Sequence, residues 1–458
     1  MNLISIESER KSRLNQNKNE DPPLPSGTIF IAENSGDMTM NKLLIEMTNN
    51  YPTFNSWRLM NDAIQSSDPK LFSDIDAVKL IHNANSVFPN KEEQFSFIVL
   101  SVVSQCVCDI LKNPFELMVN DQIFFEFLSK LPICLTVDAN FELRSILTII
   151  DIVEGLAISY NAELENDNVK AFFYQTQINI IQLISSDSYN SFVINRTIAF
   201  LDKMISITSI QTDESLQNLL KLFSNYLNSD IYSEEIQTKS MEATFHLLMQ
   251  FPILYTTIAA TPDYLNCIIS FLSKEYTCSK YAAKILHPLL SQEDSCNHLL
   301  ELKVGPALYQ ALNSKKSTKS TSVVDILEDI AAICETSEIG CSFFINSYLL
   351  QQSKIFNGSY KITVLILRII HASIEWNILP LNDQLIQLYL NVIENCLESE
   401  EPLVLSKTLK VIFTLQQAGI NVIDNVREQL EQISLGEFGD DISNAATALI
   451  QPSNVNPQ

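Results

Sequence analysis

Three acidic side chains between residues 323 and 334 are spaced so that they share one face of a helix. Asp325, Glu328 and Asp329 stand at i, i+3 and i+4, and residues three or four apart are neighbours on a helix surface. One interpretation is a solvated face. The other is an acidic strip that holds the Lys or Arg side chains of a partner peptide. General acid–base chemistry would require carboxylates that are buried and of unequal pKa.

Side chains that could support other chemistry are scattered. The sequence contains no His-Glu-x-x-His motif, no His–Cys metal spacing, no phosphate-binding loop and no Gly-x-Ser-x-Gly motif. Only 9 of the 458 residues are glycine, where average usage of about 7 % would give about thirty. We therefore expect a protein that is not an enzyme, with no catalytic residue, no cofactor and no metal site. The five histidines are expected to be packed or surface residues of helices: His82, His246, His287, His298 and His371.

The composition is that of an acidic, globular chain. The 30 Lys and Arg residues against 54 Asp and Glu give a net charge of -24, and 46 % of the residues are hydrophobic. One hydrophobic core rarely exceeds about 250–300 residues, so the chain forms either several domains or an array of small units. Its charge repels nucleic acid and anionic lipid, so we expect neither as a partner. A basic peptide would be attracted, although acidity also serves solubility.

Cysteine usage and hydropathy bear on location. Nine cysteines without a Cys-x-x-Cys spacing indicate free, buried thiols in a reducing compartment. We find no signal peptide and no stretch of about 18 apolar residues. The expected location is therefore the cytoplasm, with the nucleus as an alternative.

Apolar residues recur at helical spacing over most of the chain. Similar apolar helices are expected to begin at regular steps of 44, 42, 42, 38 and 43 residues. Further upstream the steps are looser. Two or three helices in a period of about 40–47 residues indicate a helical repeat, in which each unit must stack on its neighbours to bury its apolar face. The expected helix starts are near Leu71, Phe95, Leu143, Asn195, Lys239, Tyr281, Val323, Lys361 and Val404.

One unit can be read in detail. An amphipathic helix over 281–291 is followed by a polar break, a short helix over 296–303, a turn over 304–306 and a second helix over 307–312. In that turn, Gly305 is expected to end one helix and Pro306 to start the next. The stretch 297–314 resembles the first and second helices of an armadillo repeat, and Tyr281–Leu290 resembles its third. The resemblance implies a right-handed α-solenoid, or superhelix, of armadillo-like repeats, an all-α fold.

A more specific resemblance is to the importin-α adaptors. Leu59–Leu71 is similar to their first unit, and 429–433 with 442–446 are similar to their last. In those adaptors the third helices line the groove with Trp-x-x-x-Asn. Here the corresponding pairs are Lys284 with Pro288 and Asp325 with Asp329. The resemblance implies a concave groove that binds a partner, with Asp325, Glu328, Asp329 and Lys284 as the candidate partner-binding residues.

The expected organisation is a disordered N-terminal tail over 1–39, an armadillo-like repeat domain over 40–450 and a C-terminal tail over 451–458. The expected function is a non-enzymatic protein-binding scaffold that uses its groove, in the form of a divergent importin-α-like nuclear import adaptor. The partner would be a protein or a basic peptide, with an importin-β-like protein on the N-terminal tail. The alternative is a structural or regulatory subunit of a larger assembly, of phosphatase or cytoskeletal scaffold type, which binds through ridges and loops.

Overall fold

The computed structural model describes residues 43, 45–47, 52–65, 76–136, 141–185, 189–228, 231–274, 276–313, 320–347, 349, 359–378, 383–436 and 438–451. All regular elements in these ranges are helices, and the ranges contain no strand. The expected all-α fold class is therefore confirmed. The expected tail over 1–39 lies outside the described residues, as do residues 452–458 of the expected C-terminal tail.

The chain divides into two compact units. Unit 1 comprises residues 1–131 and 141–164, and unit 2 comprises 132–140 and 165–458. In unit 1, α6 is central and packs against α3, α5 and α10. The described helices of unit 1 are α3 (Phe54–Gln65), α5 (Ala77–Val87), α6 (Glu93–Gln105), the π-helix η1 (Cys106–Ile110), α7 (Pro114–Asn120), α8 (Gln122–Leu128), α10 (Leu143–Ile158) and the short η3 (Ala162–Leu164), while α9 (Leu131–Cys134) crosses the boundary.

One helical stretch of unit 1 is long and apolar enough to cross a membrane. Glu93–Ile110, formed by α6 and η1, meets that test by length and composition, and 56 % of it is buried in the structure. From the sequence we expected no stretch of about 18 apolar residues, so this stretch departs from that expectation. Its contacts with α3, α5 and α10 are those of a core helix.

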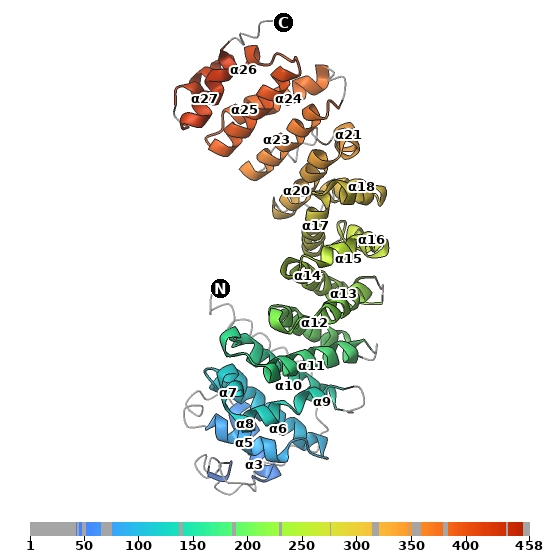
Figure 1. Ribbon diagram of the computed structural model, residues 1–458, viewed down its shortest axis with the longest axis vertical. Coiled ribbons are helices and arrows are strands. Elements are labelled where there is room, and N and C mark those ends of the chain that lie inside the picture. Colours follow the sequence, from blue (N-terminus) through green and yellow to red (C-terminus); the bar gives the residue numbers. More distant parts are fainter. Residues whose placement is uncertain are drawn as a thin grey trace. The chain divides into compact units, whose positions relative to one another are not determined.

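Unit 2 contains a row of long helices, in which each member packs against the next (Figure 1). We call it the long-helix row. Ile285 and Leu286 of α17 and Ile330 of α20 are fully buried, which shows how each helix places an apolar stripe against its neighbours. The row consists of α12 (Ser191–Ile205), α14 (Glu234–Gln250), α17 (Tyr276–Leu290), α20 (Ser320–Thr336), α23 (Tyr360–Glu375), α25 (Pro402–Gln417) and α27 (Asp440–Ile450).

A second set of helices covers one side of this row. In this set α11, α13, α16, α19 and α21 contact one another in succession, α24 contacts α26, and each also packs on a helix of the long row. The set consists of α11 (Asp167–Ile184), α13 (Asp213–Asn228), α16 (Pro262–Phe271), α19 (Val304–Asn313), α21 (Glu338–Asn346), α24 (Asp383–Leu397) and α26 (Ile423–Ser434), and the shorter α15 (Leu254–Ala259), α18 (Glu293–Glu301) and η4 (Thr208–Ile210) join it.

The expected repeat period corresponds to the spacing of these long helices. The expected starts from Phe95 to Val404 each fall at the first residue of a long helix or within its first six residues. The start expected near Leu71 lies outside the described residues. The chain is therefore all-helical and repeat-like.

Local signals explain several helix starts. The Asn190 side chain accepts a hydrogen bond from the Val193 backbone N–H at the start of α12, at 3.1 Å, and Ser233 does the same for α14. Such N-caps satisfy backbone donors that have no partner within the helix. The nine cysteines are all free and eight are buried, with Cys108 half-buried, as expected from their apolar surroundings.

The turn in the best-read unit differs from the expectation. The break falls at Lys303, whose φ is 65°, and Gly305 lies inside the first turn of α19. A Cβ on Gly305 would lie 3.2 Å from the Phe343 ring. The glycine therefore permits a close approach between α19 and α21, and does not end a helix.

Gly340 of α21 is the tightest glycine position described. A Cβ there would lie 2.3 Å from Cγ2 of Ile333 and 3.3 Å from Leu300. We expect Gly340→Ala to lower the free energy of unfolding by about 1–3 kcal/mol, because overpacking forces neighbours to move. Urea denaturation measures this. Gly305→Ala is the matched control and should change stability by less than about 1 kcal/mol, since the half-buried Phe343 ring can shift and a helical alanine is favoured. Equal effects of the two changes would contradict the packing described.

Candidate functional site

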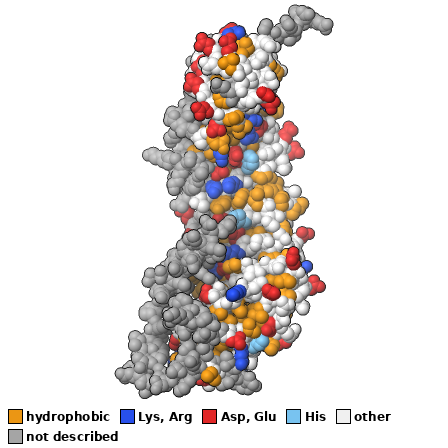
Figure 2. Space-filling model, turned by 90° about the vertical axis from the view of Figure 1, so that its left-hand side faces the viewer, with side chains coloured by type: hydrophobic (Ala, Val, Ile, Leu, Met, Phe, Trp, Pro, Cys, Tyr) orange, Lys and Arg blue, Asp and Glu red, His pale blue; other side chains and the backbone are white. Residues whose placement is uncertain are grey.

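Polar side chains from successive long helices meet on one face of the long-helix row. We call it the long-helix face. Helical spacing produces it: on α17, Lys280, Lys284 and His287 stand at i, i+4 and i+7 and share one side of the helix. In Figure 2, Lys, Arg and His side chains gather along the middle of the molecule, while Asp and Glu lie mainly toward its edges. The face is defined by Asp202, Glu242, Phe245, His246, Lys280, Tyr281, Lys284, His287, Asp325, Glu328, Asp329, Glu335, Lys361, Arg368, His371, Glu375, Lys407 and Lys410.

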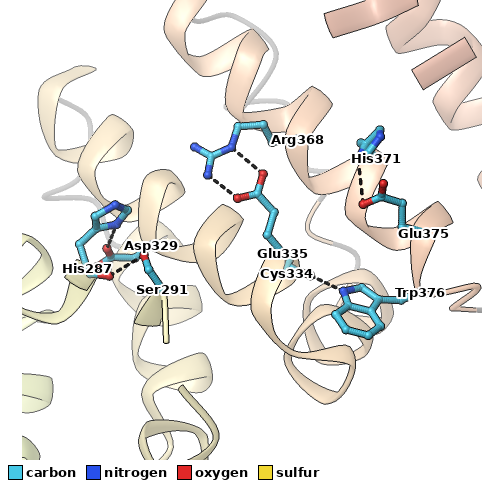
Figure 3. Close-up of polar contacts among 9 residues, drawn as sticks. All are labelled: His287, Ser291, Asp329, Cys334, Glu335, Arg368, His371, Glu375 and Trp376. Atoms are coloured by element: carbon cyan, nitrogen blue, oxygen red, sulfur yellow. Dashed lines mark hydrogen bonds and ion pairs between the residues drawn. The ribbon is translucent and has the colours of Figure 1, made fainter. Parts of the chain in front are cut away.

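The Asp329 carboxyl is buried where α20 packs on α17 (Figure 3). Its side chain is 1 % exposed, and its Oδ1 lies 3.1 Å from Nδ1 of His287. Its Oδ2 is buried without a hydrogen-bond partner among the described residues. Burial raises the pKa of Asp329 to about 7, against the lowering effect of His287. The same hydrogen bond raises the pKa of His287. Asp329 is thus held in a helix–helix contact and is not presented to a ligand.

The other two carboxylates of the expected acidic strip differ from Asp329. Glu328 is exposed and Asp325 is half-buried. Burial raises the pKa of Asp325, while the nearby ammonium groups of Lys284 and Lys280 lower it. The sequence placed the three carboxylates on one helix, as found, and gave Lys284 as a candidate on another helix of the repeat. It did not anticipate that each has a different exposure.

A bidentate ion pair joins α20 to α23. The Arg368 guanidinium donates from Nε to Oε1 of Glu335 at 2.8 Å and from Nη2 to Oε2 at 2.5 Å (Figure 3). Two parallel hydrogen bonds fix the orientation of both side chains. At the end of α23, the Trp376 indole Nε1 donates to the Cys334 carbonyl at 2.7 Å. Both contacts fix the position of α23 against α20.

His371 of α23 lies beside a carboxylate of its own helix. Its Nδ1 lies 3.2 Å from Oε2 of Glu375. Burial lowers the pKa of His371, Glu375 raises it, and the ammonium groups of Lys410 and Lys407 lower it. The two lysines of α25 are therefore close enough to His371 to act on its charge, as expected from the packing of α23 on α25.

Similar contacts join α12, α14 and α17. Nδ1 of His246 lies 2.8 Å from Oδ1 of Asp202, and this hydrogen bond raises the pKa of His246. The Tyr281 hydroxyl donates to Glu242. The Lys284 ammonium lies 5.5 Å from the centre of the Phe245 ring, within cation–π range.

The sequence reading missed these pairs, although a signal for them was present. Asp202 and His246 are 44 residues apart, and His287 and Asp329 are 42 apart. Both separations equal one repeat. A search for complementary side chains one period apart would have found both pairs. The five histidines are packed or surface residues of helices, as expected, and each also lies beside a carboxylate.

The polar contacts on this face pair side chains of neighbouring helices. Burial raises the pKa of Asp329, and the hydrogen bond to Asp329 raises the pKa of His287, so both pKa values shift in the same direction. In the described part of the chain, no group of three or more His, Cys, Asp or Glu is placed to hold a metal ion. Two surface depressions lie elsewhere, one lined by Gln416, Asp424 and Arg427 and one by Tyr360 and Asn395.

Comparisons with known proteins give a fold and no family. No protein-family model matches the chain, and no curated protein matches it. Among solved structures, an engineered protein from the Northeast Structural Genomics Consortium superposes with a TM-score of 0.63 at 11 % identity, over 90 % of this chain and 99 % of that one. A second engineered protein from the same consortium gives a TM-score of 0.32 at 11 % identity, over 74 % and 98 %. The first likeness shows a shared fold.

The pairing of Asp329 with His287 predicts a pH dependence. Both pKa values are raised in the folded state, so folding retains protons that the unfolded chain loses. The stability that they contribute is present at low pH and is lost as pH rises toward and through the folded values. The quantity to measure is the melting temperature of the unmodified chain minus the melting temperature of Asp329→Asn. We expect this difference to decrease by about 2–4 °C between pH 5 and pH 8. Thermal melts followed by circular dichroism measure it.

The control for this prediction is Glu328→Gln, one position away on the exposed side of α20. The difference between the unmodified chain and this control should stay nearly constant over the same pH range. A difference for Asp329→Asn that is flat, or that grows with pH, would contradict the assignment.

Proposed function

We propose that this chain is a non-enzymatic protein-binding scaffold of the armadillo type, and that the long-helix face receives a segment of its partner. The observation that carries the proposal is the convergence of repeat-spaced polar and aromatic side chains from α12 to α25 on that face. Stacked helical repeats use such surfaces for binding, because neighbouring units extend the same face.

The type of helical repeat and its handedness are also part of the proposal. The two sets of contacting helices in unit 2 and the spacing of about 42 residues support a right-handed solenoid of armadillo-like repeats. A fold alone does not define the partner.

The adaptor form of the hypothesis receives less support from the described residues. Asp329, one of its candidate residues, is buried against His287, and Asp325 is approached by two lysines. Lys284 contacts Phe245. A basic cargo peptide would meet Glu328 and several ammonium groups on the same surface. We therefore propose the scaffold role without assigning nuclear import.

Exposed apolar side chains keep a second candidate open, namely a subunit that binds through ridges and loops. Met249 at the end of α14, Ile253 just after it and Ile339 at the start of α21 are 60 %, 69 % and 75 % exposed. They lie at helix ends and not on the long-helix face. A partner that covers them would identify the structural-subunit alternative.

Site-specific photo-crosslinking separates the two candidates. A benzophenone amino acid replaces one residue in each variant. The Phe245 and Lys410 variants sample the long-helix face, and the Ile253 and Ile339 variants sample the helix ends. The variant at Lys221 on α13 is an exposed control site. Each variant is irradiated in extract of the cells that express the chain. We expect saturable adducts from the Phe245 and Lys410 variants, which excess unmodified chain competes away.

The remaining outcomes decide against the proposal. Adducts confined to the Ile253 and Ile339 variants would establish the ridge-binding alternative. Adducts no stronger from the face than from Lys221 would contradict a binding role for the long-helix face.

A further inference from the structure

Two helices of the long-helix face carry cations and no acidic residue, in a chain of net charge -24. Neither α17 nor α25 contains an Asp or a Glu. On α23, Lys361 and Arg368 are seven residues apart and so share one side of the helix, and Glu375 is the only acid of that helix. The long-helix face therefore gathers six cations from three helices: Lys280, Lys284, Lys361, Arg368, Lys407 and Lys410.

The acidic side chains of the same face are largely engaged by the protein itself. Asp329 is buried against His287, Glu335 is held by Arg368 and Glu375 by His371. Asp325 is half-buried between lysines. Of the five carboxylates that α20 and α23 contribute to the face, Glu328 is the exposed one that forms no ion pair with another described residue. On the neighbouring helices, Asp202 pairs with His246 and Glu242 accepts a hydrogen bond from the Tyr281 hydroxyl.

Four of the lysines are not engaged in this way. Lys280, Lys284, Lys407 and Lys410 form no ion pair with any residue that the structure describes. Lys280 and Lys284 lie over the Tyr281 and Phe245 rings, at 5.8 Å and 5.5 Å. Contact with an aromatic ring restricts an ammonium group without neutralising it. The half-buried Asp325 offsets part of the charge of Lys280 and Lys284. The stretch of the face from α17 to α25 thus keeps positive charge at both of its ends.

We propose that the occupant of the long-helix face is an acidic polypeptide segment, whose Asp and Glu side chains pair with the lysines of α17 and α25. This inference rests on the proposed function and names the chemistry of the partner. Adjacent packed helices lie about 8–10 Å apart, so the three steps from α17 to α25 span roughly 30 Å. An extended chain of about nine residues covers that distance.

Charge distribution favours an acidic peptide over the other polyanion, a nucleic acid. A phosphate backbone carries a charge at every nucleotide and would therefore place charge opposite Glu328, between the two lysine pairs. A peptide can place its carboxylates at the two lysine pairs and uncharged residues between them. At 0.15 M salt the Debye length is about 8 Å, so the distant negative charge of the chain is screened while contacts on the face remain.

Fluorescence anisotropy with labelled synthetic probes tests the proposal on the full chain. The probes are a 15-residue Glu-rich peptide, a Lys-rich peptide and a Gln/Ser peptide of the same length, and a 15-nucleotide single-stranded DNA. We expect the Glu-rich peptide to bind at least tenfold more tightly than the other three at 100 mM salt. Its affinity should weaken at least threefold at 400 mM salt, because salt screens the ion pairs.

Charge reversal on the face provides the second measurement. Lys280→Glu, Lys284→Glu, Lys407→Glu and Lys410→Glu, combined in one chain, should weaken binding of the Glu-rich peptide at least tenfold. The control combines the same change at four exposed lysines elsewhere, Lys79, Lys91, Lys112 and Lys221, and should alter affinity less than twofold. The control adds the same negative charge to the chain as the face variant does. A difference in affinity between the two variants therefore reports where on the surface the charge was changed. Circular dichroism shows whether both variants fold. If the quadruple variant does not fold, a double variant with Lys407→Glu and Lys410→Glu on α25 replaces it, and this variant should bind the Glu-rich peptide at least threefold more weakly.

Several results would overturn the inference. These are tighter binding of the Lys-rich peptide or of the DNA, no preference over the Gln/Ser peptide, or equal losses in the face and control variants. Failure of the acidic-peptide proposal is distinguishable from failure of the proposed scaffold function. If face-directed crosslinks to a partner persist while the Glu-rich peptide does not bind, the scaffold role stands and the acidic partner does not.

Discussion

Burial of apolar stripes between successive long helices is the constraint on which the rest of unit 2 depends. A helix such as α20 cannot hide Ile330 and its other apolar residues alone, so it packs on α17 on one side and α23 on the other. Those contacts leave the opposite side of each helix facing outward at a constant interval. The long-helix face follows from this arrangement, because a side chain that occupies one position on a helix meets its counterpart one repeat later.

Polar pairs fix how these helices sit against one another. The apolar stripes permit some sliding, whereas the Asp202–His246 and His287–Asp329 contacts and the Arg368–Glu335 pair each require a defined alignment. A buried carboxyl such as Asp329 is costly to desolvate. Its position is better explained by alignment of α17 and α20 than by a net gain in stability.

The helices and their period could be predicted from sequence, because both follow from the spacing of apolar residues along the chain. That spacing can be recognised without knowledge of tertiary contacts. Gly305 shows a limit: its role is a close approach to Phe343, which depends on α21 and is invisible locally. Asp329 shows another. Its spacing from Asp325 and Glu328 gave the correct helix, but exposure is decided by α17, forty residues away. Lys284 was a candidate residue from the family resemblance, and its contact with Phe245 depends on the packing of α14.

Each long helix of the row touches chiefly the one before it and the one after it. This pattern of contacts has a mechanical consequence. Disruption at one place need not spread, because distant members share no common centre. Fraying of α27 would leave α12 and α14 intact, and a protease would shorten such a chain progressively from its ends. Over evolutionary time, the same independence lets whole modules be gained or lost while the joints between the survivors remain usable.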